Sequence, residues 1–424
     1  MKHLSIVVIG AAFAAAQGLT PQESSAIKAI DAYSSNAIAL HERIVNINSG
    51  SFNPAGVVAV ADVLEPEFKA MGFTPRRIDM SAVKRGPHLV AERKGSGKRL
   101  LLIGHMDTVF EPSSPFQKLE RQGGRAVGPG AEDDKGGVAV MLMALRGLYE
   151  AGGLEGRNIT VFLTGDEEAA GDPVSISRKE FIEAGKNADA ALCFEAGSQR
   201  EGRDYVSTSR RGSAEWEVKV TSKTGHSSGI FSKDDGDGSI YELSRILSAF
   251  HDTLREPNMT YNVGLMLGGN NIKLTPGGEG SATGKRNIIP EGAVARGDLR
   301  VLTPAQLSRV KDKMQSIVAK SLPGTRSEFT LQENYPPMAP TAGNKKLLEL
   351  RNQANRALGY EEELDLDPML RGAGDISFVA PYVDSLSGLG ANGTGAHAAG
   401  ESVNLDRMPL QAKRAAVTIY RITH

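Results

Sequence analysis

The chain has 424 residues, of which 40% are hydrophobic and 23% charged, and 49 lysines and arginines face 50 aspartates and glutamates. This length predicts two or three domains, and a net charge of −1 lacks the basic excess that general binding to nucleic acid or anionic membranes requires. We therefore expect no nucleic-acid partner and no stable membrane association. The single cysteine, Cys193, excludes an intrachain disulfide, and its place in an apolar run predicts a buried structural thiol.

The N-terminal segment has the pattern of an export signal. A basic start precedes an apolar run over residues 4–16, which ends in three alanines. The run is too short to cross a bilayer, and its small-residue end resembles a signal-peptidase site. We therefore expect residues 1–17 to be a signal peptide cleaved near Ala16 or Gln17, and the mature protein to be exported, periplasmic or secreted.

Helical and strand-like segments alternate over the first half of the chain. Helices are predicted at 27–45, 55–71 and 136–150, and strands at 88–92, 99–104, 159–163 and 190–194. The last two strands are nearly continuous apolar runs, as expected for central strands covered on both faces. This alternation predicts an α/β fold in which helices pack on a mainly parallel sheet.

The pattern changes near residue 211. Residues 214–220 alternate between apolar and charged, which predicts a half-exposed strand. Helices predicted at 238–250 and 304–319 and strands at 262–267, 293–301 and 327–331 complete the order β-α-β-β-α-β. This order is typical of a small ferredoxin-like α+β sandwich with one exposed sheet face.

Beyond residue 340 the α/β pattern resumes. A helix is predicted at 345–358, a strand at 383–386 and a final helix from Pro409. We therefore expect residues 18–210 and 326–424 to form one domain, with residues 211–325 inserted into it as a second. The glycine-rich stretch 276–284 is expected to be a surface loop.

Five short polar segments stand at the ends of predicted strands or the start of a predicted helix. They cover residues 104–107, 132–137, 166–168, 194–195 and 395–397. In the first segment His105 and Asp107 lie two residues apart, so on an extended chain their side chains point the same way. His105 can then bind a metal while Asp107 accepts the proton on its other ring nitrogen. The mixture of histidines and carboxylates suits a borderline ion such as zinc.

The acidic segments leave the individual roles open. The charges of residues 132–135 stand between glycines, where a cation would neutralise them and where Asp133 or Asp134 would suit as the cap of the helix that follows. The two roles are not exclusive, and we expect different residues to fill them. Glu167 and Glu168 are adjacent and should face opposite ways, so one can bind a metal while the other acts as general base; a solvated acidic loop is the alternative. Glu195 ends an apolar strand, where an unpaired carboxylate would be costly.

With these segments in this order, the chain resembles the co-catalytic metallopeptidase family of glutamate carboxypeptidase, aminoacylase, acetylornithine deacetylase and succinyl-diaminopimelate desuccinylase. Segments 45–51, 128–137 and 287–290 are most similar to bacterial glutamate carboxypeptidases. The resemblance implies two zinc ions, with cobalt or manganese possible, and a shared water that they activate. It implies that Asp133 bridges the ions, that His105 and Glu195 bind one and Glu168 and His397 the other, that Glu167 is the general base and that Asp107 orients His105.

The resemblance also implies a homodimer formed through the inserted domain, which would serve for dimerisation and as a lid. His226 resembles the histidine that one subunit donates across the dimer to polarise the scissile carbonyl. Asn287 and Arg300 match positions that contact substrate, and Arg371 is a further candidate because arginine binds carboxylates bidentately. Arg210 and Arg211 receive little weight, since charged residues near a hinge are usually solvated.

Together these features lead to the hypothesis of a metal-dependent carboxypeptidase. It would hydrolyse an amide bond beside a free C-terminal carboxylate in a small peptide and release glutamate or another amino acid. An N-acyl-amino-acid deacylase is the alternative, since it shares the mechanism and differs in the pocket. A non-catalytic binding protein is disfavoured because each ligand and Glu167 are present. Two departures from the family pattern are Glu132, where small residues are commoner, and the length of the 276–284 stretch.

Overall fold

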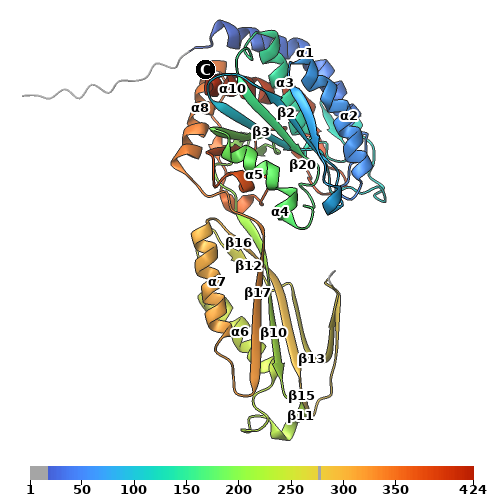
Figure 1. Ribbon diagram of the computed structural model, residues 1–424, viewed down its shortest axis with the longest axis vertical. Coiled ribbons are helices and arrows are strands. Elements are labelled where there is room, and N and C mark those ends of the chain that lie inside the picture. Colours follow the sequence, from blue (N-terminus) through green and yellow to red (C-terminus); the bar gives the residue numbers. More distant parts are fainter. Residues whose placement is uncertain (1–17, 276–277) are drawn as a thin grey trace, which may run out of the picture.

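The computed structural model describes residues 18–275 and 278–424, which form two lobes joined by a narrow connection (Figure 1). The first lobe contains residues 18–211 and 336–424, and the second contains the described residues of 212–335. The predicted signal peptide, residues 1–17, lies outside the described residues. Among the helices of the described ranges, none has the length and apolar character that crossing a bilayer demands.

The first lobe is built on a six-stranded sheet in the order β1-β2-β6-β3-β7-β19. The strands are β1 (Thr74–Ile78), β2 (His88–Arg93), β3 (Arg99–His105), β6 (Asn158–Thr164), β7 (Ala190–Cys193) and β19 (Ser385–Ser387). The four strands from β6 to β19 pair in parallel, whereas β1 and β2 are antiparallel at one edge. The predicted α/β fold with a mainly parallel sheet is confirmed. Since β3, β6 and β7 are parallel, the segments that follow them meet at one edge.

Helices cover both faces of this sheet (Figure 1). They are α1 (Pro21–Val45), α2 (Pro54–Ala70), α3 (Lys135–Glu150), α5 (Lys179–Lys186), α8 (Ala342–Leu358), α9 (Ile376–Val379) and α10 (Met408–Thr423). Side chains alternate along β3, so Leu100 and Leu102 pack with α1, α3 and α10, while Leu101 and Ile103 pack with α5 and α9. Cys193 is buried in the second of these cores, as predicted.

Helix α1 begins at Pro21 rather than at the predicted residue 27. Thr20 caps it by accepting a hydrogen bond from the Glu23 N–H at 3.1 Å, and Glu23 Oε2 accepts one from the Thr20 N–H at 2.7 Å. The reciprocal cap and Pro21 in the first helical position stabilise the first turn of the helix. That turn is polar and lacks apolar periodicity, so the predicted start was too late.

The second lobe is an antiparallel sheet with two helices on one face. Its strands are β10 (Gly212–Ser222), β12 (Thr260–Tyr261), β13 (Leu265–Leu274), β14 (Gly280–Thr283), β16 (Gly292–Val301) and β17 (Thr325–Tyr335), and its helices are α6 (Ser239–Thr253) and α7 (Pro304–Val318). The main strand order is β14-β13-β16-β10-β17. Alternate residues of β10, among them Trp216 and Val218, form the core with both helices. The predicted β-α-β-β-α-β order of an inserted ferredoxin-like unit is confirmed.

Two predicted features of this lobe need correction. Strand β17 pairs with β10 from Thr325 to Tyr335, so the second sheet extends ten positions beyond the predicted domain boundary at residue 325. The glycine-rich stretch is not wholly a loop, because Gly280–Thr283 forms β14 and pairs with the outer half of β13. The backbone of the edge strand β13 forms hydrogen bonds with this segment, and these hydrogen bonds outweigh the low strand propensity of glycine.

Candidate metal centre

The five polar segments predicted from the sequence converge at the carboxyl edge of the parallel strands. His105 ends β3, Glu167 and Glu168 follow β6, and Glu195 follows β7. Asp133 lies in the loop before α3, and His397 lies between β20 (Gly393–Thr394) and β21 (Ser402–Asn404). Helix α3 approaches the end of β7 closely, because a Cβ atom on Gly137 would overlap the carbonyl oxygen of Phe194.

Asp133 lies between the two histidines. Its Oδ1 is 3.2 Å from His105 Nε2 and its Oδ2 is 3.3 Å from His397 Nε2. Each histidine also faces one further carboxylate, with His105 Nε2 3.6 Å from Glu195 Oε1 and His397 Nε2 3.0 Å from Glu168 Oε2. The structure therefore brings together all five residues that were expected to be ligands, with the aspartate in the bridging position.

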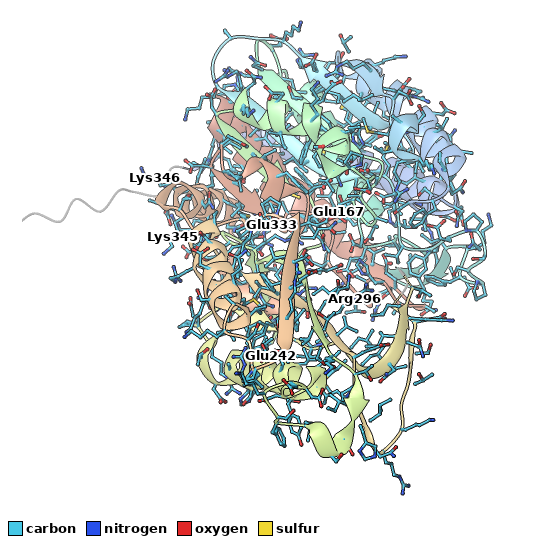
Figure 2. All side chains as sticks on the ribbon, turned by 60° about the horizontal axis from the view of Figure 1, so that its bottom comes forward. Glu167, Glu242, Arg296, Glu333, Lys345 and Lys346 are labelled. Atoms are coloured by element: carbon cyan, nitrogen blue, oxygen red, sulfur yellow. The ribbon has the colours of Figure 1, made fainter. Side chains whose placement is uncertain are left out.

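Glu167 lies on the His105 side of the centre. Ligand atoms of His105, Glu167 and Glu195 are all within 4.8 Å of one another, as are those of His105, Asp133 and Glu168. Figure 2 places Glu167 close to where β17, which carries Glu333, meets the first lobe. The adjacent carboxylates of residues 167 and 168 thus face different parts of the centre, as expected, although the chain bends and turns here rather than being extended.

Asp107 supports both the first histidine and the acidic segment. Its Oδ1 is 3.3 Å from His105 Nδ1, so it can fix the tautomer that leaves Nε2 free to bind a metal. The same carboxylate accepts hydrogen bonds from the backbone N–H groups of Glu167 at 2.9 Å and Glu168 at 3.1 Å, and from the Ser51 hydroxyl at 2.6 Å.

Asp134 is buried and occupies the N-cap position of α3, but it is not a side-chain cap. Its Oδ2 instead accepts a hydrogen bond from the His105 backbone N–H at 3.2 Å. The peptide bond between Asp133 and Asp134 is cis. Of the two interpretations of this acidic loop, capping by Asp134 is therefore wrong, and the loop belongs to the centre.

The charges in the centre fit divalent cations. Burial and the nearby Glu195 raise the pKa of Glu167, and burial with the nearby Asp133 raises the pKa of Glu168 to about 7. Hydrogen bonds to Asp133 and Glu168 raise the pKa of His397 to about 11. The carboxylates are thus too crowded to ionise together without added positive charge. Two imidazoles with a bridging and two terminal carboxylates form a donor set that suits two ions of the zinc type.

Two residues that hold ligands in place were not expected from the sequence: Glu401 was not considered, and the expectation that Arg210 and Arg211 are solvated is wrong, since both are buried. Glu401 is buried and accepts hydrogen bonds from the backbone N–H groups of Glu132 at 2.8 Å and Asp133 at 3.0 Å. Arg210 is also buried, and its Nη1 donates to Glu195 Oε2 at 3.0 Å. The available signals were weak: Glu401 stands four positions after His397, and Arg210 stands where the sequence pattern changes.

A cavity of about 260 Å³ opens onto the centre. Four of the five expected ligands line it, all but His105, together with Glu167, Glu132, Arg210 and Arg371. Arg371 donates a hydrogen bond to the carbonyl oxygen of Ala196 at 2.7 Å and lies 3.6 Å from Glu195 Oε2. Burial and the neighbouring Asp133 raise the pKa of Glu132 to about 8. Arg300, on β16, does not line this cavity; its guanidinium lies near Gly372, which does, and it pairs with Asp298 at 3.2 Å.

His226 and Asn287 lie elsewhere in the same chain. They flank the short pair of β11 (Gly225–His226) and β15 (Ile288–Ile289), at the end of the second lobe farthest from the first (Figure 1). The Ser227 N–H donates to the carbonyl oxygen of Asn287 at 3.0 Å, so the two candidates are neighbours. A single chain therefore does not bring either of them to the metal centre.

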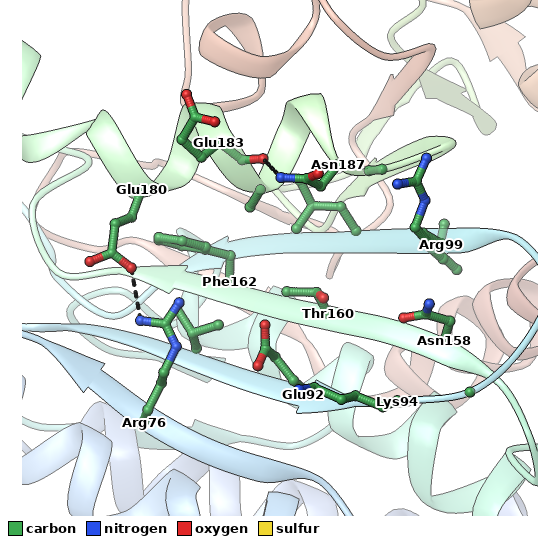
Figure 3. Close-up of a pocket in the computed structure, with 16 residues that line it drawn as sticks. Arg76, Glu92, Lys94, Arg99, Asn158, Thr160, Phe162, Glu180, Glu183 and Asn187 are labelled. Carbon is green, nitrogen blue, oxygen red and sulfur yellow. Dashed lines mark hydrogen bonds and ion pairs between the residues drawn. The ribbon is translucent and has the colours of Figure 1, made fainter.

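A larger cavity of about 490 Å³ lies over the other ends of β3 and β6 (Figure 3). Its rim is charged, and both of its arginines are paired, with Arg76 2.8 Å from Glu180 and Arg99 2.8 Å from Asp189. Its polar groups do not converge on one point as those of the metal centre do, so the smaller cavity is the candidate site of chemistry.

The first lobe has a mainly parallel sheet, and an aspartate lies between two histidine–carboxylate pairs at its carboxyl edge. Together with the inserted antiparallel lobe, this arrangement defines the class of two-metal hydrolases. The chain belongs to peptidase family M20/M25/M40, whose sequence model matches residues 101–421. It is thus a metal-dependent hydrolytic enzyme, and the resemblance on which the sequence analysis relied is confirmed. The hypothesis of a non-catalytic binding protein is set aside.

Individual relatives support the same family. Carboxypeptidase G2 of Pseudomonas sp. (strain RS-16) is 29% identical over 395 residues, which cover 88% of this chain and 86% of that protein. Succinyl-diaminopimelate desuccinylase of Rhodospirillum centenum is 30% identical over 190 residues, covering 42% and 48% of the two chains. The structure of aminopeptidase PepT from Bacillus cereus matches with a TM-score of 0.72 at 18% identity, covering 92% of this chain and 99% of that one. The last match shows the shared fold.

Proposed function

We propose that this protein is a carboxypeptidase that hydrolyses the amide bond next to the free C-terminal carboxylate of a small peptide. The observation that carries the proposal is the position of Asp133 between His105 and His397, each with its own second carboxylate. Carboxypeptidase G2, which is 29% identical over 88% of this chain, supports C-terminal cleavage. Glutamate is our first candidate for the released amino acid, and N-acyl-amino-acid deacylation is the alternative.

Zinc is the proposed metal at both positions, with cobalt or manganese as alternatives, since mixed nitrogen and oxygen sites accept several ions. When bound, the ions supply Lewis-acid polarisation of the scissile carbonyl and lower the pKa of water. Glu167 accepts a proton from the attacking water while the water oxygen forms a bond to the carbonyl carbon. Glu167 then returns that proton to the departing nitrogen as the C–N bond breaks.

Arg300 and Arg371 are the proposed contacts for the substrate carboxylate in the same chain. Arg371 lines the cavity but already lies close to Glu195, whereas the Arg300 side chain lies near the lining residue Gly372 and is 38% exposed. Arginine binds a carboxylate through two parallel N–H donors. Arg300 is therefore our first choice for this contact, and Arg371 the second.

We further propose a homodimer in which His226 and Asn287 of one chain complete the centre of the other. Their proximity at one tip of the second lobe supports a shared role. Large apolar side chains are exposed nearby: Phe231 at 64%, Met266 at 56%, Tyr241 at 55% and Ile240 at 42%. Phe231 and Tyr241 contact each other, with ring centroids 5.6 Å apart. An apolar cluster of this kind fits a contact between copies of the chain.

The activity is tested by amino-acid release from a panel of dipeptides and N-acyl amino acids that end in Glu, Asp, Ala, Phe or Leu. Release governed by the C-terminal residue, and abolished by a chelator, supports a carboxypeptidase. Release governed by the acyl group supports the deacylase instead. Glu167→Gln should retain bound metal and lose activity; activity that persists in that variant contradicts the role of Glu167 as base.

The shared centre is tested by mixing two inactive variants, His226→Ala and Glu167→Gln. A mixed dimer contains one complete site, so random exchange should restore roughly a quarter of the normal activity. The matched control is a mixture of His226→Ala with Asn287→Ala, in which each site receives a defective tip and no activity returns. If the first mixture stays inactive although mixed dimers form, His226 does not act across the dimer.

A further inference from the structure

The two segments that connect the lobes both contact residues of the metal centre. Arg210, just before β10, holds Glu195, and Tyr335, the last residue of β17, reaches Glu167. The two connections are also joined to each other, since Arg210 and Met338 exchange backbone hydrogen bonds of 3.0 Å in both directions. The chain therefore enters and leaves the second lobe beside two carboxylates of the centre.

Tyr335 holds the backbone of Glu167 from the side of the second lobe. Its hydroxyl donates a hydrogen bond to the carbonyl oxygen of Glu167 at 2.5 Å. On the other side of the same residue, the Glu167 N–H donates to Asp107 Oδ1 at 2.9 Å. The backbone of Glu167 is thus held at its N–H group by Asp107 of the first lobe and at its C=O group by Tyr335 of the second lobe.

The tyrosine ring is held independently of its hydroxyl group. It packs against Phe378, with ring centroids 5.1 Å apart and ring planes at 56°. The guanidinium of Arg178 lies 5.4 Å from the centre of the Phe378 ring and pairs with Asp375 at 2.8 Å. Removing only the hydroxyl would leave this packing in place, so its hydrogen bond to Glu167 can be tested separately.

We propose that Tyr335 is a positioning residue for Glu167, and that it links the placement of the general base to the placement of the second lobe. This proposal rests on the proposed function, in which Glu167 moves the proton. A base is effective only where its carboxylate is held within hydrogen-bond reach of the water. With its carbonyl released, the Glu167 backbone loses its anchor from the second lobe and keeps those from Asp107, at the N–H groups of Glu167 and Glu168, so the carboxylate samples unproductive positions.

The test is Tyr335→Phe, assayed on the best substrate of the panel described above. We expect kcat to fall roughly ten- to a hundredfold, as for a small misplacement of a catalytic group, with KM within about twofold and metal content unchanged. The matched control is Tyr261→Phe, because Tyr261 also lies in the second lobe and donates to a backbone carbonyl, that of Phe250 at 2.8 Å. This control should keep the normal kcat.

A second comparison asks whether Tyr335 acts through Glu167. In a Glu167→Gln background, Tyr335→Phe should lower the residual rate no further. A normal kcat in Tyr335→Phe would overturn the proposal, and so would an equal loss in Tyr261→Phe or loss of metal from Tyr335→Phe. Full activity of Glu167→Gln alone would contradict the proposed function instead, so the two failures are distinguishable.

Discussion

The backbone N–H of Asp133 donates a hydrogen bond of 3.0 Å to the carboxylate of Glu401. The same carboxylate also accepts from the N–H groups of Gly130 at 3.3 Å and Glu132 at 2.8 Å. Because Glu401 follows His397 in the chain by four positions, it ties the loop of the bridging aspartate to the loop of the second histidine. Asp133, which lies between the two ligand pairs, is therefore held in place by the carboxylate of Glu401. Glu401 is not itself expected to be a ligand.

Glu401→Gln should weaken both the fold of this loop and the binding of metal. The amide would direct its NH₂ group at backbone donors, and leaving such buried groups unpaired costs about 1–3 kcal/mol of unfolding free energy. Urea unfolding with and without added zinc measures both effects. Glu361→Gln is the control, since Glu361 is 77% exposed and pairs only with Arg203. Equal stability of the two variants would contradict the structural role of Glu401.

Arg210→Met should lower both metal affinity and stability, because Arg210 also donates to the carbonyl oxygens of Gly372 at 2.8 Å and Ala373 at 2.6 Å. Arg210 orients Glu195 through a 3.0 Å hydrogen bond, and loss of such a supporting partner reduces metal affinity about 10- to 100-fold. Competition with a chelator measures the change. Arg211→Met is the neighbouring control, because Arg211 bonds to Thr260 at 2.8 Å and to the carbonyl of Pro368 at 3.2 Å. Unchanged zinc affinity in Arg210→Met would exclude this support.

Asp133→Asn should remove most metal and nearly all activity. The neutral amide cannot bridge two cations with both of its polar atoms, so we expect kcat/KM to fall at least roughly a thousandfold. Metal content per chain and the rate on the best substrate are measured together. Asp189→Asn is the matched control, since Asp189 pairs with Arg99 at 2.8 Å at the opposite ends of the strands. Full metal content in Asp133→Asn would contradict the bridging position.

The stability of the metal-free protein should depend on pH through His41. This residue is buried in α1 and its Nε2 lies 2.8 Å from the carbonyl oxygen of Ala131. Burial lowers the pKa of His41 to about 4, from an ordinary value of 6.5. Between these two pH values the unfolded chain binds a proton at His41 that the folded chain does not, so the contribution of His41 to the unfolding free energy falls as the pH falls, by up to about 3 kcal/mol. The raised pKa values of Glu132 and Glu168 act in the opposite sense, so this contribution is the difference between the unaltered protein and a variant without His41.

Urea unfolding at several pH values between 7 and 4 tests this contribution of His41. His41→Gln should lose the steep part of the dependence over this range, because glutamine does not titrate. His251→Gln should keep it, since His251 is 67% exposed. Parallel pH profiles for His41→Gln and the unaltered protein would show that His41 does not carry the effect.

Much of the candidate site was predictable from short segments of sequence. His105, Glu167, Glu168 and Glu195 each end or follow an apolar run, and parallel strands gather their carboxyl ends at one edge. The order of elements in the second lobe was likewise visible in its period-two alternation. The end of that lobe was misplaced because the alternation of β17 fades toward Tyr335, while its pairing with β10 continues.

The sequence by itself determined the family, the order of the elements and the ligand-bearing segments, because strand periodicity and motif composition are local properties. Only the tertiary structure decided which side chains support the ligands. Glu401 and Asp133 are 268 positions apart, and Tyr335 and Glu167 are 168 positions apart. Such contacts depend on how two segments far apart in the sequence are oriented once the whole chain has packed. No local sequence pattern determines that orientation.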